Sequence, residues 1–171
     1  MSIVLIGYRG SGKTTIGRKL ADRLGWPFVD SDIEVVKLAG KSIKEIFESD
    51  GEPAFRDLES AVVADLVTLA KHVISLGGGA VMRMQNSNAI RAHGHTIIYL
   101  RADAQTLHDR IHADPVTKSD RPALTKLGGG IDEILHLLAT REPAYRAAMT
   151  TELDVTHLSP DQAVDRILQK S

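Results

Sequence analysis

The chain of 171 residues contains no cysteine. It can therefore form no disulfide, and it offers no thiolate as a nucleophile or as a zinc ligand. The absence of cysteine suits a reducing compartment. A chain of this length can bury about 70% of its unfolded surface without covalent staples, and we expect one domain over residues 1–171.

Long apolar runs and an excess of one charge are also missing. The stretch 61–70 is interrupted by Asp65, so no run approaches the roughly 20 residues that cross a bilayer. The first residues show no basic leader, and we expect a cytoplasmic protein. With 21 basic and 22 acidic residues the net charge is −1, which argues against nucleic acid or membrane as a partner.

Short apolar runs alternate with longer stretches of helical periodicity, as in α/β proteins with a parallel sheet. A helix is expected over 13–24, ended by Gly25. Ser42 and Glu45 form a capping-box pattern, and Pro53 is placed to begin a helix that ends near Ala70. A last helix follows Ser159. Strands are expected at five ranges, 3–6, 27–30, 72–76, 96–100 and 153–155.

A phosphate-binding motif follows the first strand. Residues 7–15 read GYRGSGKTT, which matches G-x-x-x-x-G-K-[ST] between a buried strand and an amphipathic helix. The glycines let backbone amides surround a phosphate at a helix N-terminus. Lys13 can reach the β- and γ-phosphates, and the Thr14 hydroxyl can hold Mg²⁺. The motif predicts a nucleoside triphosphate with magnesium. By itself it does not separate a kinase from a GTPase or a mechanical ATPase.

Two carboxylates follow the second strand. Asp30 and Asp32 are expected on one side of an extended chain, at the sheet edge where strand carboxyl ends face a ligand. One could order the water shell of the metal while the other bonds an acceptor hydroxyl. A solvated strand end with a helix cap is the alternative interpretation.

Three glycines and three arginines complete the candidate site. The third strand ends in Gly77-Gly78-Gly79 rather than in an acid, which indicates a close backbone approach. Arg56, Arg121 and Arg141 lie near loops, and arginine suits bidentate binding of carboxylate or phosphate. Any one of them taken alone could equally be a solvated surface residue.

Together these motifs resemble the shikimate kinase family over nearly the whole chain. The matching segments are GYRGSGKTT at 7–15, FVDSD at 28–32, GEPAFRDLE at 51–59, SLGGGAV at 75–81, DRP at 120–122 and REPAYR at 141–146. The resemblance implies transfer of the γ-phosphoryl group of ATP to the 3-hydroxyl of shikimate, in chorismate and aromatic amino acid biosynthesis. It also implies a monomeric three-layer P-loop domain with a five-stranded parallel sheet in the order 2-3-1-4-5. A mobile substrate-binding region would span about 32–60, and a lid about 111–125.

The resemblance also assigns roles to single residues. ATP would be bound by residues of segment 7–15, which we name the cradle, and by two arginines: Gly10, Ser11, Gly12, Lys13, Thr14, Thr15, Arg110 and Arg121. Shikimate would be bound by Asp32, Arg56, Gly78, Gly79 and Arg141. Lys13, Asp32 and Arg121 would be catalytic. Mg²⁺ would be held by Thr14 and, through water, by Asp30. The segment between Arg110 and Arg121 is several residues longer than the family pattern.

Other interpretations stay open at this point. A kinase for gluconate or for a nucleotide could share the cradle, and a P-loop regulator could bind ATP with a relic acceptor site. His108 and His112 have the i, i+4 spacing of zinc ligands, but without a third ligand they indicate a solvated helix face. Tyr8 and Arg9 occupy variable positions of the motif and are expected on the loop surface.

Overall fold

The computed structural model describes residues 1–115, 128 and 130–170. Along these residues the elements are β1 (Ile3–Ile6), α1 (Lys13–Leu24), β2 (Phe28–Asp30), α2 (Ser31–Ala39), α3 (Ile43–Ser49), α4 (Glu52–Leu66), β3 (Val73–Ser75), the 3₁₀ turn η1 (Ala80–Met82), α5 (Met84–Ala92), β4 (Thr96–Arg101), α6 (Ala104–Ala113), α8 (Ile131–Ala148), β5 (Thr151–Asp154) and α9 (Pro160–Lys170).

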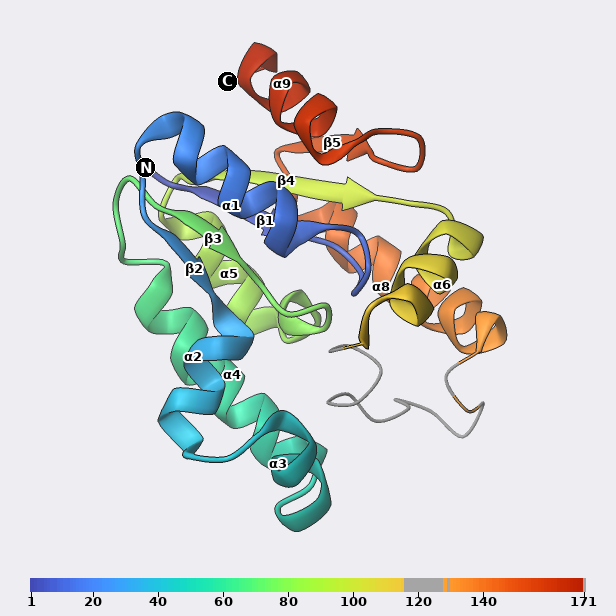
Figure 1. Ribbon diagram of the computed structural model, residues 1–171. Helices are drawn as coiled ribbons and strands as arrows, with labels where there is room; N and C mark the ends of the chain where they lie inside the picture. Colours follow the sequence, from blue (N-terminus) through green and yellow to red (C-terminus); the bar gives the residue numbers. More distant parts are fainter. Residues whose placement is uncertain (116–127, 129, 171) are drawn as a thin grey trace.

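The five strands form one parallel sheet in the order β2-β3-β1-β4-β5, which confirms the predicted order (Figure 1). In the central strand Val4 lies opposite Ile74 of β3 and Ile97 of β4. Because all strands are parallel, their carboxyl ends meet at one edge of the sheet. The loops that follow β1, β2 and β3 therefore lie close together at that edge.

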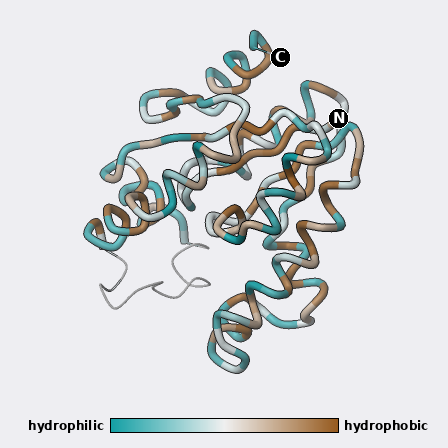
Figure 2. Tube along the Cα trace, turned by 180° about the vertical axis from the view of Figure 1, so that it is seen from behind, coloured by the Kyte–Doolittle hydropathy of each residue, from teal (hydrophilic) through white to brown (hydrophobic). Residues whose placement is uncertain are grey.

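A separate hydrophobic core covers each face of the sheet. Ile3 and Leu5 of β1 belong to one core, whereas Val4 and Ile6 belong to the other. Figure 2 shows the hydrophobic central strands of the sheet in brown, surrounded by helices of mixed hydropathy. This alternation follows from the period of two along a strand, and it produces the predicted three-layer α/β/α arrangement.

The helices divide between the two faces. Helices α1 and α9 pack together beside the first core, and α4, α5 and η1 pack against the second. Helix α8 contributes Ile134 to the first core and Tyr145 to the second. Helices α2 and α3 and the start of α4 extend below the sheet in Figure 1, within the predicted substrate-binding region 32–60. None of the helices formed by the described residues has the length and apolar character that a membrane crossing requires.

Most helix and strand ends lie at or within one residue of the positions predicted from the sequence. Gly25 ends α1 with a φ of 66°, and Ser42 and Glu45 form the predicted capping box of α3. Two boundaries differ from the prediction by two residues or more. Helix α4 ends at Leu66, before Ala70, and β5 begins at Thr151, two residues before the predicted start. The charged residue Glu152 lies in β5, an edge strand, where a weak apolar pattern is expected.

Candidate active site

The cradle, residues 7–15, has the predicted wrapped backbone. Gly10 and Gly12 have φ values of 81° and 93°, in the left-handed region that other residues rarely adopt. A Cβ on Gly10 would also stand 2.8 Å from Cγ1 of Ile111 in α6. Both the backbone angle and the lack of space therefore require glycine at this position. Helix α1 begins at Lys13, and its first backbone amides therefore face the hollow of the loop.

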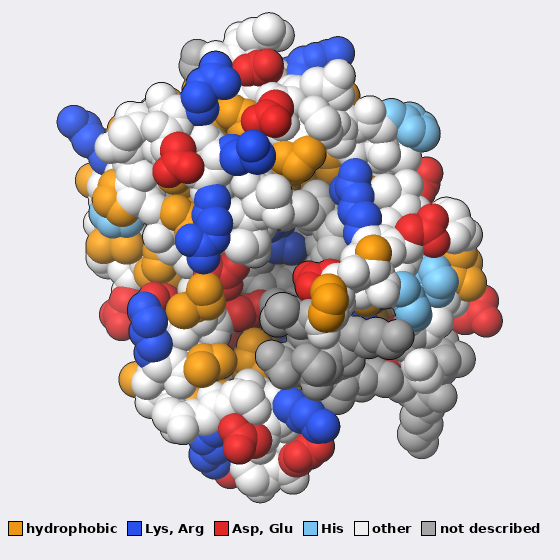
Figure 3. All heavy atoms as spheres, in the orientation of Figure 1, with side chains coloured by type: hydrophobic (Ala, Val, Ile, Leu, Met, Phe, Trp, Pro, Cys, Tyr) orange, Lys and Arg blue, Asp and Glu red, His pale blue; other side chains and the backbone are white. Residues whose placement is uncertain are grey.

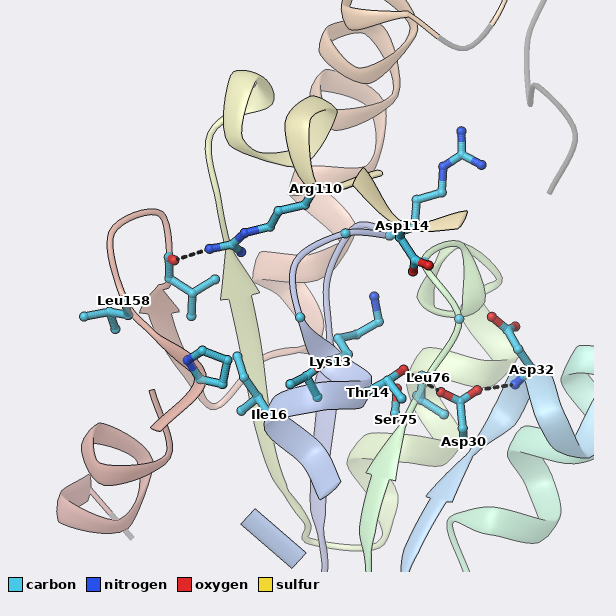
Figure 4. Close-up of a pocket in the computed structure, with 18 residues that line it drawn as sticks. Lys13, Thr14, Ile16, Asp30, Asp32, Ser75, Leu76, Arg110, Asp114 and Leu158 are labelled. Atoms are coloured by element: carbon cyan, nitrogen blue, oxygen red, sulfur yellow. Dashed lines mark hydrogen bonds between the residues drawn. The ribbon is translucent and has the colours of Figure 1, made fainter. Parts of the chain in front are cut away.

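The cradle opens into a cavity of about 340 Å³, which we name the cradle cavity. Figure 3 shows this face of the molecule hollowed near its centre, with basic and acidic side chains around the hollow. The cavity is lined by nine residues that the sequence assigned to the site: Gly10, Gly12, Lys13, Thr14, Thr15, Asp30, Asp32, Gly78 and Arg110. Asp114, which follows α6, also lines it, and nothing in the sequence singled it out (Figure 4).

Lys13 is buried beneath the cradle. Its Nζ donates to the carbonyl oxygens of Gly7 at 2.7 Å and Tyr8 at 2.9 Å. These bonds hold the ammonium group at the wall of the cradle cavity (Figure 4). A short rotation of the side chain would exchange these carbonyls for phosphate oxygens, which are stronger partners for an ammonium ion.

Two oxygens near Lys13 suit a magnesium ion. The Thr14 hydroxyl lies 3.2 Å from Asp30 Oδ2. No cluster of three acidic or histidine side chains with metal-binding geometry occurs in the described ranges. Mg²⁺ commonly takes one or two protein oxygens and completes its shell with water and phosphate. Thr14 and Asp30 fit that requirement.

The relation between Asp30 and Asp32 matches the helix cap of the alternative interpretation and not the extended pair. Strand β2 ends at Asp30 and helix α2 starts at Ser31, so the two residues do not share an extended chain. Asp30 caps the helix instead: its Oδ1 accepts a hydrogen bond from the Asp32 amide at 2.9 Å. The two carboxylates nevertheless line the same cavity, because the cap turns the chain at the sheet edge (Figure 4).

A second, smaller cavity adjoins the first. We name it the arginine cavity, and it contains all the residues assigned to acceptor binding: Asp32, Arg56, Gly78, Gly79 and Arg141. Its apolar wall includes Phe47 and Phe55, whose ring centroids are 5.0 Å apart. Asp32 and Gly78 line both cavities. The geometry thus places a carboxylate where the contents of the two cavities would meet.

Glu59 stands behind the arginine cavity and was not assigned a role from the sequence. Its side chain is 1% exposed, and its Oε1 accepts from Arg56 Nη1 at 2.7 Å. Burial raises the pKa of Glu59, the charge of Arg56 opposes this rise, and the nearby Asp32 adds to it. The spacing i, i+3 from Arg56 on one helix was the available signal. This carboxylate holds the Arg56 guanidinium toward the cavity.

The glycine turn after β3 is closely packed, as the sequence predicted. A Cβ on Gly79 would stand 2.6 Å from both Nη atoms of Arg56. On Gly77 it would stand 2.8 Å from both Asp32 Oδ1 and Glu59 Oε2. Only a turn without side chains therefore leaves room for these three charged groups.

Two residues outside the predicted set fix this turn. The Gly77 amide donates to Ser31 Oγ at 2.9 Å, and the Tyr145 hydroxyl donates to the carbonyl oxygen of Gly78. The Tyr145 ring is fully buried and stacks on Tyr99, with centroids 4.9 Å apart. Burial raises the pKa of Tyr145 above its ordinary value, so the hydroxyl keeps the proton that it donates.

The other residues predicted to bind ATP do not all line the cradle cavity. Arg110 Nη2 donates to the carbonyl oxygen of Val155 at 3.0 Å, at the far end of the cradle cavity (Figure 4). The Ser11 side chain is fully buried and does not line the cavity, so only its backbone amide could serve a phosphate. Arg121 and most of the predicted lid lie outside the described residues. Residues 111–113 of that range form the last turn of α6.

Tyr8 and Arg9 are not loop surface, which corrects the prediction. Tyr8 is 1% exposed and Arg9 8% exposed. Arg9 Nη2 lies 3.5 Å from Glu133 Oε2 of α8, a fully buried carboxylate. Arg9 also lines both cavities. A single sequence holds no signal for this, because the partner helix lies more than 120 residues away.

The rings of His108 and His112 lie against each other on α6 with centroids 4.0 Å apart; His108 is partly exposed to solvent and His112 is exposed. Within the part of the chain that the structure describes, no third metal ligand joins them. This agrees with the interpretation of a solvated helix face.

Comparison with known proteins identifies close relatives. The family model described as shikimate kinase matches residues 9–171. A shikimate kinase of Rhodopirellula baltica is 38% identical over 167 residues, covering 98% of this chain and 88% of the relative. Shikimate kinase 2 of Yersinia pestis is 41% identical over 169 residues, covering 98% and 94%. The solved structure of shikimate kinase from Acinetobacter baumannii in complex with shikimate matches with a TM-score of 0.91 at 31% identity, covering 99% of this chain and 91% of that one.

Proposed function

Because the chain belongs to the shikimate kinase family, we propose that it transfers the γ-phosphoryl group of ATP to the 3-hydroxyl of shikimate. The products are shikimate 3-phosphate and ADP. The observation that carries the proposal is the junction of the two cavities, where Asp32 and the Gly78 backbone belong to both walls. A phosphoryl donor in the cradle and a carboxylate-bearing acceptor beside the arginines would meet there.

The cradle binds the triphosphate of ATP. Backbone amides from Gly10 to Thr15 surround the phosphates, and the start of α1 adds its positive partial charge. Lys13 leaves the carbonyls of Gly7 and Tyr8 and stabilises the charge of the γ-phosphoryl group. Arg110 borders the base end of the cavity. The family resemblance assigns Arg121, which lies outside the described residues, to the phosphates.

Magnesium is the cofactor that this donor set fits. Thr14 would hold Mg²⁺ directly and Asp30 through water, as the family resemblance implies, and their oxygens, 3.2 Å apart, are close enough to serve one ion. When bound, Mg²⁺ neutralises phosphate charge as it accumulates on the leaving ADP.

The arginine cavity binds the acceptor through the negative charge of the acceptor carboxylate. Arg56 and Arg141 pair with the shikimate carboxylate, and the backbone of Gly78 and Gly79 closes over the ring. Glu59 keeps Arg56 in place. Phe47 and Phe55 contact the apolar face of the ring.

Asp32 orients the 3-hydroxyl and takes its proton. The hydroxyl oxygen forms the new bond to the γ-phosphorus as the bond from that phosphorus to the bridging oxygen breaks. The electron pair of the broken bond stays with ADP, and the proton passes to the Asp32 carboxylate. Catalysis thus rests on alignment and charge neutralisation more than on covalent participation by the protein.

The test is release of ADP in a coupled assay with Mg-ATP and one of shikimate, quinate, gluconate or no acceptor. We expect release that depends on shikimate. Release with gluconate alone would assign the chain to another substrate. ATP binding without any acceptor-dependent release would mean that the acceptor site is a relic. The cytoplasmic location, the single domain and the monomeric state stay predictions, to be checked by fractionation and by light scattering.

A further inference from the structure

The guanidinium of Arg141 rests on the ring of a cradle residue. Its Cζ lies 5.6 Å from the centroid of the Tyr8 ring. Both side chains are buried, Tyr8 at 1% and Arg141 at 7% exposure. A cation over an aromatic face is attracted by the ring quadrupole, and the attraction strengthens when water is excluded. Arg141 lines the arginine cavity and Tyr8 does not, so the ring supports Arg141 from outside that cavity.

Tyr8 itself is held firmly. Its carbonyl oxygen accepts from the Ser11 amide at 3.2 Å, a bond that does not depend on Lys13, and its ring belongs to the core on the α1 face. Its hydroxyl has no hydrogen-bond partner of good geometry among the described residues, although the Arg9 side chain lies close enough to lower its pKa. Burial raises the pKa of Tyr8, so the hydroxyl carries no charge at neutral pH. The ring face, rather than the hydroxyl, is the part of Tyr8 that serves the site.

Arg9, the residue after Tyr8, forms a second contact between the cradle and α8. Arg9 pairs with Glu133, which lies eight residues before Arg141 on α8. Two turns of helix thus separate a buried ion pair from the cation–π contact, and both join α8 to the cradle. Together the two contacts restrict how far α8, and with it Arg141, can move relative to the cradle.

We propose that Tyr8 is a positioning residue for Arg141 and thereby sets the selectivity of this enzyme for an acceptor that carries a carboxylate. The proposal rests on the proposed function, because it takes Arg141 as a ligand of the shikimate carboxylate. Tyr8 does not contact the reacting atoms. Its effect is on the direction of one guanidinium.

The experiment compares Tyr8→Leu with Tyr8→Phe, using shikimate and its uncharged methyl ester as acceptors at saturating Mg-ATP. Leucine removes the ring, whereas phenylalanine keeps the ring and removes only the hydroxyl. We expect Tyr8→Leu to raise the KM for shikimate about five- to thirtyfold, the range of a desolvated cation–π contact. The KM for the ester should change less than about twofold, and Tyr8→Phe should match the wild type with both acceptors.

The ratio of the two KM values separates positioning from general damage. A loosened core would raise both KM values together, and that result would overturn the proposal. So would an unchanged ratio in Tyr8→Leu. If the wild type itself does not phosphorylate shikimate, the proposed function fails and this inference falls with it. If Tyr8→Leu does not fold, Tyr8→Met provides the second test, because the flexible methionine side chain fills the space without an aromatic face. It should raise the same KM ratio at least threefold, and an unchanged ratio would count against the proposal.

Discussion

Replacing Arg141 by methionine removes one of the two cations that we assign to the acceptor carboxylate. Arg141 is 7% exposed, so its attraction to a bound carboxylate is little screened by water. Truncating one partner of such a pair costs about 2–4 kcal/mol. At about 1.4 kcal/mol per factor of ten, the KM for shikimate should rise about 30- to 700-fold.

The structure indicates that the rise in the KM for shikimate lies toward the lower end of that range. Arg56 remains in the same cavity, with its guanidinium 2.7 Å from Glu59 Oε1, and it can still pair with the carboxylate. Arg141 also lowers the pKa of Glu59 in part, so its loss leaves that buried carboxyl easier to protonate. Lysine at position 141 should fall between arginine and methionine, because it keeps the charge and loses the bidentate fork.

The assay is the initial rate over a series of shikimate concentrations at saturating Mg-ATP. Arg146→Met is the matched control, since Arg146 lies on the same helix but forms exposed ion pairs with Glu142 and Glu152. Exposed pairs contribute little, and the control should keep both KM values within twofold. A rise of less than about threefold in Arg141→Met, with an unchanged melting temperature and KM for ATP, would refute the assignment.

Four further predictions concern other parts of the site. Lys13→Ala should nearly abolish phosphoryl transfer while the fold persists, as measured by ADP release and circular dichroism. Gly79→Ala should raise the KM for shikimate about tenfold, because the new Cβ would stand 2.6 Å from the Arg56 guanidinium and displace it; an unchanged KM would show that Arg56 can move freely. Arg121→Ala should reduce kcat more than the affinity for ATP, and an unaltered kcat would remove this residue from the reaction. Glu59 has its pKa raised by burial, so the folded chain binds this proton more tightly than the unfolded chain does. The free energy of unfolding of the wild type, relative to Glu59→Gln, should therefore fall as pH rises above about 4.5, and a rise measured in urea would contradict this.

The parts of the site that the sequence predicted correctly are local. The cradle is a contiguous segment whose glycine spacing specifies its own backbone, and α1 begins and ends where its residues predict. The strand runs were found because each is apolar and short, and the sheet order followed from the family resemblance. The extended pair Asp30 and Asp32 was wrong for a local reason as well. The Asp30 side chain bonds the Asp32 amide and starts a helix, which competes with continuing the strand.

The amino-acid sequence by itself thus determined the phosphate cradle, the strand-helix alternation and the family. Each of these depends on residues near one another in the chain, where backbone preference and periodicity are strong. The tertiary structure alone decided that Asp32 stands between two cavities, that Glu59 backs Arg56, and that Tyr8 and Arg9 turn inward to α8. These contacts join segments far apart in sequence at one edge of a parallel sheet. Their geometry follows from how the layers pack, and no pattern within a single segment records it.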